Sequence, residues 1–509
     1  MHWVGNVTLI NAFIEASADS PEVPFIAVSD FNPAEDSLSN IVRDGRRMGT
    51  RLAKMGTIPG DIIGVMLPNW REWMVACVAT QQAGAVMLPI VTIYGAKELG
   101  FILRQSRAKM LLTPDHWRGT DYAELVASAG DLPDLRHHIR LGDEFNALAA
   151  AVEIAGPAER QPNDLALLVY TSGTTADPKG VMHSSKTILA ELAAQEASRA
   201  DIANETILTP WPPGHVAGAL SLLRFLAYGV PIVAMDQWNA EKAAELIDRH
   251  KVTTSSGTPF HLSGIVEAAD ASGHDLSSLR NYIVGAAPVP STLVERCLSQ
   301  QLAVYHCYGS SEHPTVTSGT AQDPLAKQLH TEGRAIGACE MRFVDDDGND
   351  MAEGKDGEIC TRGPELFMGY FDEVLNADAF LPGGWYRTGD IGRLDADGYL
   401  LITDRKKDII IRGGENISSK EVEGIMLRHP AVADVAVVAA PDERMGEVVR
   451  ACVVLRARET LTLEKVQAHF AAAGIAKQKT PERLTLHDAL PRNASGKVLK
   501  HELRKVPIQ

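Results

Sequence analysis

Between residues 60 and 310 the chain alternates short apolar runs with helix-like stretches, and this rhythm restricts its fold more than any other feature. The strand-like runs are residues 61–67, 85–90, 231–235, 281–284 and 302–308, and the helix-like stretches are residues 70–82, 240–250 and 291–300. Strands that alternate with helices form parallel sheets covered by helices on both faces. We therefore predict an α/β fold with doubly wound parallel sheets, in which ligands bind beyond the carboxyl ends of the strands.

The chain has 509 residues, more than the roughly 250–300 at which a single core stops growing. A turn-rich stretch at 387–412 contains the charge cluster 404–408, with the sequence DRKKD. The remainder contains strand-like runs at 435–439 and 448–455, a helical stretch at 463–473 and a further strand near Arg483. We predict a large domain over residues 1–404, a small mobile α+β domain over 405–509, and a hinge at about 404–408.

The segment 170–180, with the sequence YTSGTTADPKG, has the composition of a phosphate-binding loop. Gly173 and Gly180 let backbone N–H groups turn toward an anion, and Lys179 supplies a positive charge. The segment differs from a Walker A loop, because Lys179 precedes a glycine instead of Ser or Thr. A polar surface loop between the buried strand 165–169 and a helix that begins near residue 184 is the alternative.

Three further motifs suit nucleotide chemistry. Residues 308–312, YGSSE, combine an aromatic ring for a purine, hydroxyls for a phosphate and a carboxylate for Mg²⁺. Residues 385–390, WYRTGD, place a carboxylate after a tight turn, where it suits the hydroxyls of a ribose. Residues 491–497, PRNASGK, end on a lysine after a flexible glycine, which suits a mobile cation. Each motif on its own also fits an ordinary surface turn.

In their order and spacing, these motifs resemble the adenylate-forming superfamily of acyl-CoA synthetases, peptide-synthetase adenylation domains and beetle luciferases. The resemblance extends over residues 60–504 and includes the segments 285–288, 357–364, 368–370, 413–417 and 441–447. It implies a β-barrel-like subdomain in the large domain and an AMP-forming acid–thiol ligase that uses ATP, Mg²⁺ and coenzyme A. It also implies activation of a carboxylic acid as an acyl-adenylate, followed by transfer to a thiol.

The resemblance assigns roles to individual residues. For the β- and γ-phosphates of ATP it implies Thr171, Ser172, Gly173, Thr174, Thr175 and Lys179. For adenine and the α-phosphate it implies Gly285, Ala286, Ala287, Tyr308, Gly309, Ser310 and Ser311. Asp390 and Arg405 are implied to bind the ribose, and Glu312 and Thr171 to bind Mg²⁺. The catalytic residues that it implies are Lys497, Glu312, Thr171 and His215. Lys407 is implied to be the hinge, and Gly413 and Gly414 to line the CoA channel.

Four positions depart from the family pattern. Ala176 and Ala286 stand where glycine is usual, Asp404 replaces the glycine that usually precedes the Arg405 position, and Lys500 stands where arginine is commoner. None of these changes removes a chemical group that the mechanism needs.

The segment 211–218, WPPGHVAG, occupies the place where acyl-CoA synthetases line the acyl pocket. Amino-acid-activating relatives have a carboxylate nearby, whereas residues 207–220 contain none. The candidate acyl pocket consists of His215, Val216, Thr258, Val284 and His306. Small and apolar side chains imply a hydrophobic acid without a charged amino group. The resemblance of residues 211–260 to bacterial short- or medium-chain and cyclohexanecarboxylate-type CoA ligases implies a short- or medium-chain or alicyclic acid. A lone histidine such as His215 is otherwise more often structural.

Two other functions compete with a CoA ligase. An adenylation enzyme could load the acyl group onto a carrier-protein phosphopantetheine, and the segment 36–38, DSL, matches the short core of such an attachment site. We instead expect Ser37 to be a helix N-cap. A catalytically dead homologue is disfavoured by the presence of every charged residue that the mechanism needs. His306, Cys307 and His313 could suggest a metal site, but we expect them to pack or to line the pocket.

The net charge of −16 argues against general affinity for nucleic acid or anionic membranes. Six cysteines lack a CxxC spacing, which predicts reduced thiols in the cytoplasm. The first residues lack the pattern of a signal peptide, and no apolar run is long enough to span a membrane. We expect a carboxylic acid and CoA as the partners; relatives commonly form dimers, so a homodimer is one open arrangement.

Overall fold

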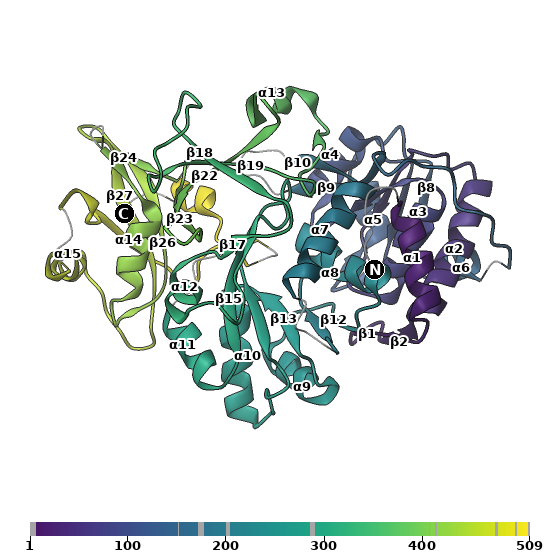
Figure 1. The fold of residues 1–509 in the computed structure, drawn as a ribbon, viewed down its shortest axis with the longest axis horizontal. Helices are drawn as coiled ribbons and strands as arrows, with labels where there is room; N and C mark the ends of the chain where they lie inside the picture. Colours follow the sequence, from purple (N-terminus) through teal and green to yellow (C-terminus); the bar gives the residue numbers. More distant parts are fainter. Residues whose placement is uncertain are drawn as a thin grey trace.

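The computed structural model describes residues 7–150, 152–171, 178–199, 204–285, 291–406, 408–412, 415–473, 477–493 and 496–506. Figure 1 shows a larger part at the right and centre, which contains the first three sheets, and a smaller part at the left, which ends at the C-terminus.

The first sheet is mainly parallel and provides most of the candidate site. Its strand order is β17 (Arg334–Ala335), β16 (Thr317–Ser318), β15 (Ala303–Tyr308), β14 (Asn281–Val284), β13 (Thr254–Gly257), β11 (Ile207–Thr209), β12 (Ile232–Met235), β1 (Pro24–Val28) and β2 (Ala34–Ser37). The strands from β15 to β1 pair in parallel, whereas β2, β16 and β17 add antiparallel edges. The carboxyl ends of β11, β13, β14 and β15 therefore meet at one edge of the sheet.

The second sheet has the order β20 (Gly369–Tyr370), β10 (Lys179–Ser184), β9 (Leu165–Thr171), β4 (Val86–Pro89), β3 (Ile62–Val65), β5 (Met110–Thr113) and β8 (His137–Arg140). Its central strands are parallel, but β10 pairs antiparallel with β9, and Lys179 lies opposite Thr171. The phosphate loop predicted from the sequence therefore joins two paired strands. The helix that the sequence predicted to begin near residue 184 is α7, which begins at Ser185, but strand β10, which the sequence did not predict, lies between the loop and this helix.

Two smaller sheets complete the described strands, together with the short pair β6 (His116–Trp117) and β7 (Thr120–Asp121). The third sheet is antiparallel and contains β18 (Glu340–Val344), β19 (Gly357–Arg362), β22 (Trp385–Leu394), β21 (Phe380–Leu381) and β23 (Leu400–Arg405). A β-barrel-like subdomain was expected within the large domain, and this antiparallel sheet is the part of the structure that corresponds to it. The fourth contains β25 (Glu415–Ile417), β24 (Ile410–Arg412), β27 (Gly446–Leu455), β26 (Val432–Asp442) and β28 (Arg483–Leu486).

The helices are α1 (Leu9–Asp19), α2 (Leu38–Lys54), α3 (Arg71–Gln82), α4 (Ala96–Ser106), α5 (Tyr122–Ala127), α6 (Asp143–Ala149), α7 (Ser185–Ser198), α8 (Val216–Tyr228), α9 (Ala240–His250), α10 (Pro259–Ser272), α11 (Ser291–Ser299), α12 (Leu325–His330), α13 (Asn376–Ala379), α14 (Ser419–Leu427), α15 (Leu463–Ala472) and α16 (Lys500–Lys505). Two short 3₁₀ turns, Glu373–Leu375 and Lys477–Lys479, are also present. Within the described ranges, no helix is both long and apolar enough to cross a lipid bilayer.

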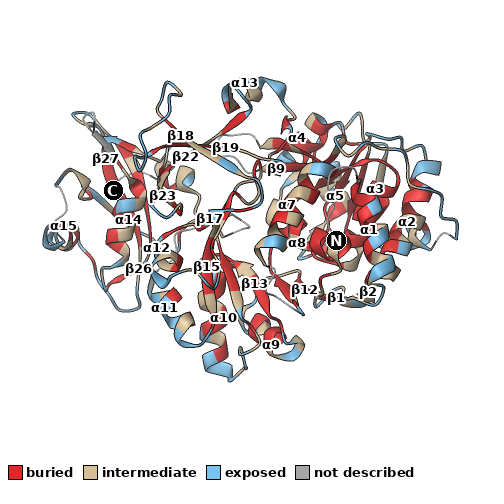
Figure 2. Ribbon diagram, viewed as in Figure 1, coloured by how far each residue is buried: buried red, intermediate tan, exposed pale blue. Residues whose placement is uncertain are grey.

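The largest hydrophobic core lies between the two parallel sheets. It combines buried residues of α1, α2, α3, α7 and α8 with inward-facing residues of β1, β3, β4, β9 and β12. Figure 2 shows this buried interior, with the exposed residues on the outer helix faces. The opposite faces of the two sheets are covered by α9, α10 and α11 and by α4 and α5. Helices therefore cover both faces of each sheet, which is the doubly wound arrangement that the sequence predicted.

The fourth sheet has a core of its own, formed by α14, α15 and the strands β24 to β27. The residues of this core all lie beyond residue 409. The predicted strands and helix of this region correspond to β26, β27, β28 and α15. The division of the chain at residue 404 stays a prediction. All six cysteines lie in described segments, and none forms a disulfide bond.

Candidate functional site

The candidate acyl pocket is built at the carboxyl ends of neighbouring parallel strands. His215 follows β11 and precedes α8, Thr258 follows β13 and precedes α10, Val284 ends β14, and His306 lies in β15. These strands lie side by side in the order β15, β14, β13 and β11. The topology therefore places predicted pocket residues at one edge, although they are far apart in the sequence.

The pocket residues are mostly buried and neutral. Val284 is fully buried, Thr258 is 1% exposed, and burial lowers the pKa of His215 to about 4. The Nε2 atoms of both His215 and His306 are buried and find no hydrogen-bond partner among the described residues. Val216 begins α8 directly beside His215. At neutral pH His215 is therefore uncharged, and its ring is compatible with an apolar acyl group.

A second histidine, which the sequence reasoning missed, supports Thr258. The Thr258 hydroxyl lies 2.8 Å from His261 Nδ1, and the Thr258 backbone N–H donates to the same nitrogen at 3.1 Å. The His261 ring packs against Trp211, Trp238 and Phe260, with centroid distances of 5.8, 4.5 and 5.6 Å. Burial lowers the pKa of His261 to about 4. The spacing of Thr258 and His261, three residues apart at the start of a helix, was the available signal.

The phosphate loop is described at its two ends. Thr171 ends β9 and Lys179 begins β10, where the Nζ atom lies 5.1 Å from the centre of the Tyr370 ring. Ser172, Gly173, Thr174 and Thr175 lie outside the described residues. The described ends place the charge of Lys179 beside the aromatic side chains that surround Glu312.

Glu312 is 9% exposed, and its Oε1 atom accepts a hydrogen bond from the Tyr370 hydroxyl at 2.7 Å. The Tyr386 hydroxyl lies 3.3 Å from that of Tyr370. The described residues contain no group of three or more His, Cys, Asp or Glu side chains that could hold a metal. A single carboxylate is nevertheless compatible with Mg²⁺, which commonly combines one or two carboxylates with substrate phosphates and water.

The turn around Glu312 is held in place by its own hydroxyl and by a distant histidine. The Ser310 hydroxyl accepts hydrogen bonds from the N–H groups of Glu312 and His313, both at 3.2 Å. His183 Nε2 lies 2.8 Å from the Ser311 carbonyl oxygen. A Cβ atom at Gly309 would lie 1.9 Å from a backbone oxygen of the next turn, so that position excludes any side chain. The YGSSE motif is therefore a constrained turn.

Both oxygens of the predicted ribose-binding carboxylate have partners. The Tyr308 hydroxyl donates to Asp390 Oδ2 at 2.8 Å, and Arg405 Nε lies 2.8 Å from Asp390 Oδ1. Burial would lower the pKa of Arg405, but Asp390 and Tyr308 raise it, so the guanidinium stays charged. The structure thus brings three predicted nucleotide residues together from β15, β22 and β23.

The segment that carries Lys497 lies against the candidate acyl pocket. Gly496 has a φ of +79°, and a Cβ atom at this position would lie 3.4 Å from Thr258 Oγ1 and 3.8 Å from His261 Cε1. The Lys497 N–H donates to Asn493 Oδ1 at 2.9 Å. Lys497 therefore follows a residue whose backbone lies close to Thr258 of the pocket, which is compatible with the prediction of a cation delivered to the site.

Several predicted residues cannot be placed. Ala286, Ala287, Lys407, Gly413 and Gly414 lie outside the described residues. Gly285 is described at the end of β14, where its N–H donates to the Gly257 carbonyl at 3.2 Å.

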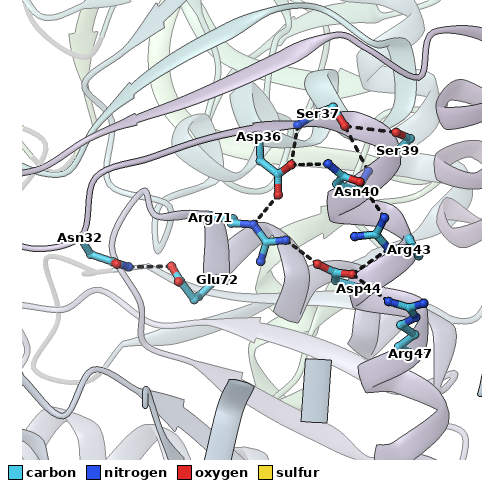
Figure 3. Close-up of polar contacts among 10 residues, drawn as sticks. All are labelled: Asn32, Asp36, Ser37, Ser39, Asn40, Arg43, Asp44, Arg47, Arg71 and Glu72. Atoms are coloured by element: carbon cyan, nitrogen blue, oxygen red, sulfur yellow. Dashed lines mark hydrogen bonds and ion pairs between the residues drawn. The ribbon is translucent and has the colours of Figure 1, made fainter. Parts of the chain in front are cut away.

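Ser37 is the N-cap of α2, as the sequence predicted, and its hydroxyl accepts a hydrogen bond from the Asn40 N–H at 3.3 Å. The neighbouring Asp36 forms an ion pair with Arg71, with Nε and Oδ2 2.6 Å apart. Figure 3 shows this polar cluster, in which Arg71 lies between Asp36 and Asp44. The DSL segment therefore has a local structural role.

Comparisons with known proteins agree with this geometry. A family model described as "AMP-binding enzyme" matches residues 37–371, and one described as "AMP-binding enzyme C-terminal domain" matches residues 421–497. A medium-chain fatty-acid–CoA ligase of Escherichia coli is 35% identical, with 98% of this chain and 90% of the relative covered. A 7a-methyl-1,5-dioxo-octahydroindenylpropanoyl:CoA ligase of Rhodococcus jostii is also 35% identical, with 98% of each chain covered.

Among solved structures, the chain is similar to o-succinylbenzoate CoA synthetase from Bacillus subtilis in complex with its acyl-adenylate intermediate. The identity is 28%, the TM-score is 0.86, and 99% of each chain is covered. A structure of the same enzyme with ATP and a magnesium ion is 27% identical, with a TM-score of 0.84 and coverage of 98% and 100%.

Proposed function

Because the chain belongs to the AMP-binding enzyme family, we propose that it is an ATP-dependent carboxylic acid–CoA ligase that acts through an acyl-adenylate. The observation that carries this proposal is the proximity of Gly496, which precedes Lys497, to Thr258 of the candidate acyl pocket: a Cβ atom built at Gly496 would lie 3.4 Å from Thr258 Oγ1. Lys497 would therefore contact the acid at the carboxyl edge of the first sheet, where the YGSSE motif also begins at the end of β15.

The first half-reaction converts the carboxylate of the acid, which is a poor electrophile, into an acyl-adenylate. A carboxylate oxygen of the acid attacks the α-phosphorus of ATP, the bond between the α- and β-phosphates breaks, and pyrophosphate leaves. Two anions must approach each other, so the residues contribute positioning and positive charge. Lys497 bridges the carboxylate and the α-phosphate, while Lys179 and the phosphate loop hold the departing phosphates. Asp390, oriented by Tyr308 and Arg405, binds the ribose.

Mg²⁺ fits the carboxylate of Glu312 and the hydroxyl of Thr171, and when bound it offsets the negative charge of the phosphates. The Tyr370 hydroxyl keeps the Glu312 carboxylate in its orientation. Gly285, Ala286 and Ala287 flank the adenine.

In the second half-reaction the sulfur of CoA attacks the acyl carbon, the acyl–phosphate bond breaks, and AMP leaves. This step needs an open path for pantetheine and no longer needs Lys497. Rotation of the segment 405–509 about Lys407 satisfies both demands, because it withdraws Lys497 and presents Gly413 and Gly414 instead. The separate core of this segment supports its movement as a unit.

The substrate is a hydrophobic acid, short- or medium-chain or alicyclic. Support comes from the buried, neutral side chains of the pocket, where His215 and His261 both have a pKa of about 4. A charged amino group on the acid would need a carboxylate partner, and residues 207–220 contain none. Relatives that act on a medium-chain fatty acid and on a ring-bearing propanoate agree with this substrate class. The unpaired cysteines agree with a cytoplasmic location.

Pyrophosphate release by the purified full chain tests the proposal. The panel contains hexanoate, octanoate, cyclohexanecarboxylate, benzoate and the amino acid leucine, each with ATP and Mg²⁺ and with or without CoA. We expect release with the linear or alicyclic acids, none with leucine, and an acyl-CoA product when CoA is present. Thioester formation only on a phosphopantetheinylated carrier protein would show that the chain loads carriers instead. No pyrophosphate release with any acid would refute an adenylating enzyme of this substrate class.

A further inference from the structure

Three consecutive residues of strand β23 accept hydrogen bonds from three consecutive residues at the start of helix α14. Ser418 Oγ donates to the Thr403 carbonyl at 2.9 Å, and Lys420 Nζ donates to the Ile402 carbonyl at 2.9 Å. The Ser419 N–H donates to Asp404 Oδ2 at 3.1 Å. Figure 1 shows α14 beside β23 at the junction of the two parts of the molecule. These contacts join residues on opposite sides of the hinge proposed at 404–408.

Lys420 also extends a polar chain into the candidate pocket. Its Nζ atom lies 3.7 Å from Glu332 Oε1, and Glu332 Oε2 lies 3.5 Å from His306 Nδ1. Burial would raise the pKa of Glu332, but His306 and Lys420 lower it, so Glu332 is ionised. Glu332 therefore links a pocket residue of β15 to a residue beyond the hinge.

A hollow of about 430 Å³ lies along the contact between β23 and α14. Its lining combines the contacting residues Ile402, Thr403, Asp404, Ser418 and Lys420 with Asp356, Ile409 and Glu421. The hydrogen bonds between β23 and α14 therefore lie beside an open space. Polar contacts beside an open space can be exchanged for water at a small net cost, so they suit an interface that opens in every turnover.

We propose that Asp404, Lys420 and Glu332 form a latch that holds the segment 405–509 in the orientation in which Lys497 reaches the pocket. The latch, which rests on the proposed function, makes these three side chains positioning residues for the adenylating half-reaction. Rotation about Lys407 toward the CoA-binding orientation breaks their contacts. Asp404 stands where the sequence pattern of the family usually has glycine, and a glycine would lack the carboxylate that Ser419 meets.

Separate assays of the two half-reactions test the latch. The variant Lys420→Met keeps the length of the side chain but removes its charge and its donor. We expect ATP–pyrophosphate exchange to fall about 5- to 20-fold, because fewer molecules hold Lys497 in place. Thioester formation from supplied acyl-adenylate and CoA should be unchanged or faster, because the rotated orientation becomes easier to reach.

A neighbouring ion pair provides a matched control. Glu421, the next residue of α14, pairs with Lys479 at 2.7 Å, and both lie beyond the hinge. Glu421→Gln should leave the ratio of the two half-reactions unchanged, and Lys420→Arg should restore most of the exchange activity. If Lys420→Met does not fold, as judged by its thermal unfolding, Glu332→Gln replaces it and should change the ratio in the same direction.

An equal loss of both half-reactions in the folded variants, or no change in either, would overturn the latch. The same would follow if Glu421→Gln shifted the ratio as much as Lys420→Met. Absence of exchange in the unsubstituted protein with every acid would instead refute the proposed function, so the two failures are distinguishable.

Discussion

Arg405 Nε lies 2.8 Å from Asp390 Oδ1. The two residues belong to different sequence motifs and are brought together by the pairing of strands β22 and β23. The other oxygen of Asp390 accepts the Tyr308 hydroxyl at 2.8 Å. The Asp390 side chain is 8% exposed, so these partners fix its orientation before any ligand binds. Preorganisation of this kind reduces the entropy cost of binding a ribose.

We expect Tyr308→Phe to weaken ATP binding, because Asp390 loses one of the two partners that orient it. The loss of about 1 kcal/mol corresponds to a roughly 5-fold higher KM for ATP. Steady-state kinetics at saturating acid measures this change. The matched control is Tyr399→Phe, whose hydroxyl donates to Asp323 at 2.7 Å in a partly buried Tyr–Asp pair. A change in the KM for the acid with that for ATP unaltered would contradict the assignment.

Removal of the Tyr370 hydroxyl should alter the dependence on Mg²⁺, because this hydroxyl donates to Glu312 Oε1. In Tyr370→Phe we expect half-maximal pyrophosphate release to require about 10- to 100-fold more Mg²⁺, as is typical when a residue that orients a metal ligand is lost, and a larger increase in Glu312→Gln. A Mg²⁺ titration at fixed ATP gives both values. Tyr122→Phe, a change in a remote buried tyrosine, serves as the control. Unaltered titration curves for both site variants would exclude Glu312 as the Mg²⁺ ligand.

Lys497→Ala should abolish adenylation selectively. Loss of a preorganised cation that stabilises the transition state costs about 3–4 kcal/mol, or roughly 10²- to 10³-fold in rate. Single-turnover formation of acyl-adenylate measures the first half-reaction, and consumption of supplied acyl-adenylate with CoA measures the second. The second should stay within about 2-fold of the unsubstituted protein. Lys505→Ala, at an exposed position in the same terminal segment, should affect neither.

The stability of the fold should depend on pH through Glu191. This side chain is fully buried, and burial raises its pKa to about 7, although its Oε1 atom accepts hydrogen bonds from Gln195 and Thr315. The unfolded chain loses this proton near pH 4.5, so the favourable contribution of the neutral acid to folding is present below pH 4.5 and is lost as the pH rises to about 7.

Glu191→Gln, which is neutral at every pH, should therefore gain stability relative to the unsubstituted protein between pH 4.5 and 7. The gain should reach about 3 kcal/mol at pH 7 and above and should stay constant from there. Urea unfolding across this pH range measures it. Glu22→Gln, at an exposed position, should show no such trend. A difference between Glu191→Gln and the unsubstituted protein that does not change with pH would contradict a raised pKa.

Much of the fold followed from local patterns. The helical stretch predicted at 240–250 is α9 with the same bounds, and the strand predicted at 281–284 is β14. The apolar periodicity, the capping residues and the flanking glycines that define such elements all lie within one window of the sequence. Ser37 shows the same principle, because its capping bond reaches only to Asn40.

Strand β10 was missed because residues 179–184, KGVMHS, have weak strand character of their own. Their extended conformation depends on pairing with β9 on one side and with β20, distant in the sequence, on the other. Tyr370 was missed as a site residue for a similar reason. It acquires a functional setting only through its contact with Glu312, and a single sequence carries no sign of such a contact. His261 did leave a local sign, its capping-box spacing from Thr258.

By itself, the sequence determined the chemical groups and their order along the chain: a phosphate loop, a carboxylate for Mg²⁺, a carboxylate for ribose and a lysine near the end. Only the tertiary structure decided which of them meet. The approach of Gly496 to Thr258, and the ion pairs that link Lys420 through Glu332 to His306, join residues that are far apart in the sequence. Local propensity acts over a few residues, whereas these encounters depend on how whole sheets and helices pack against each other.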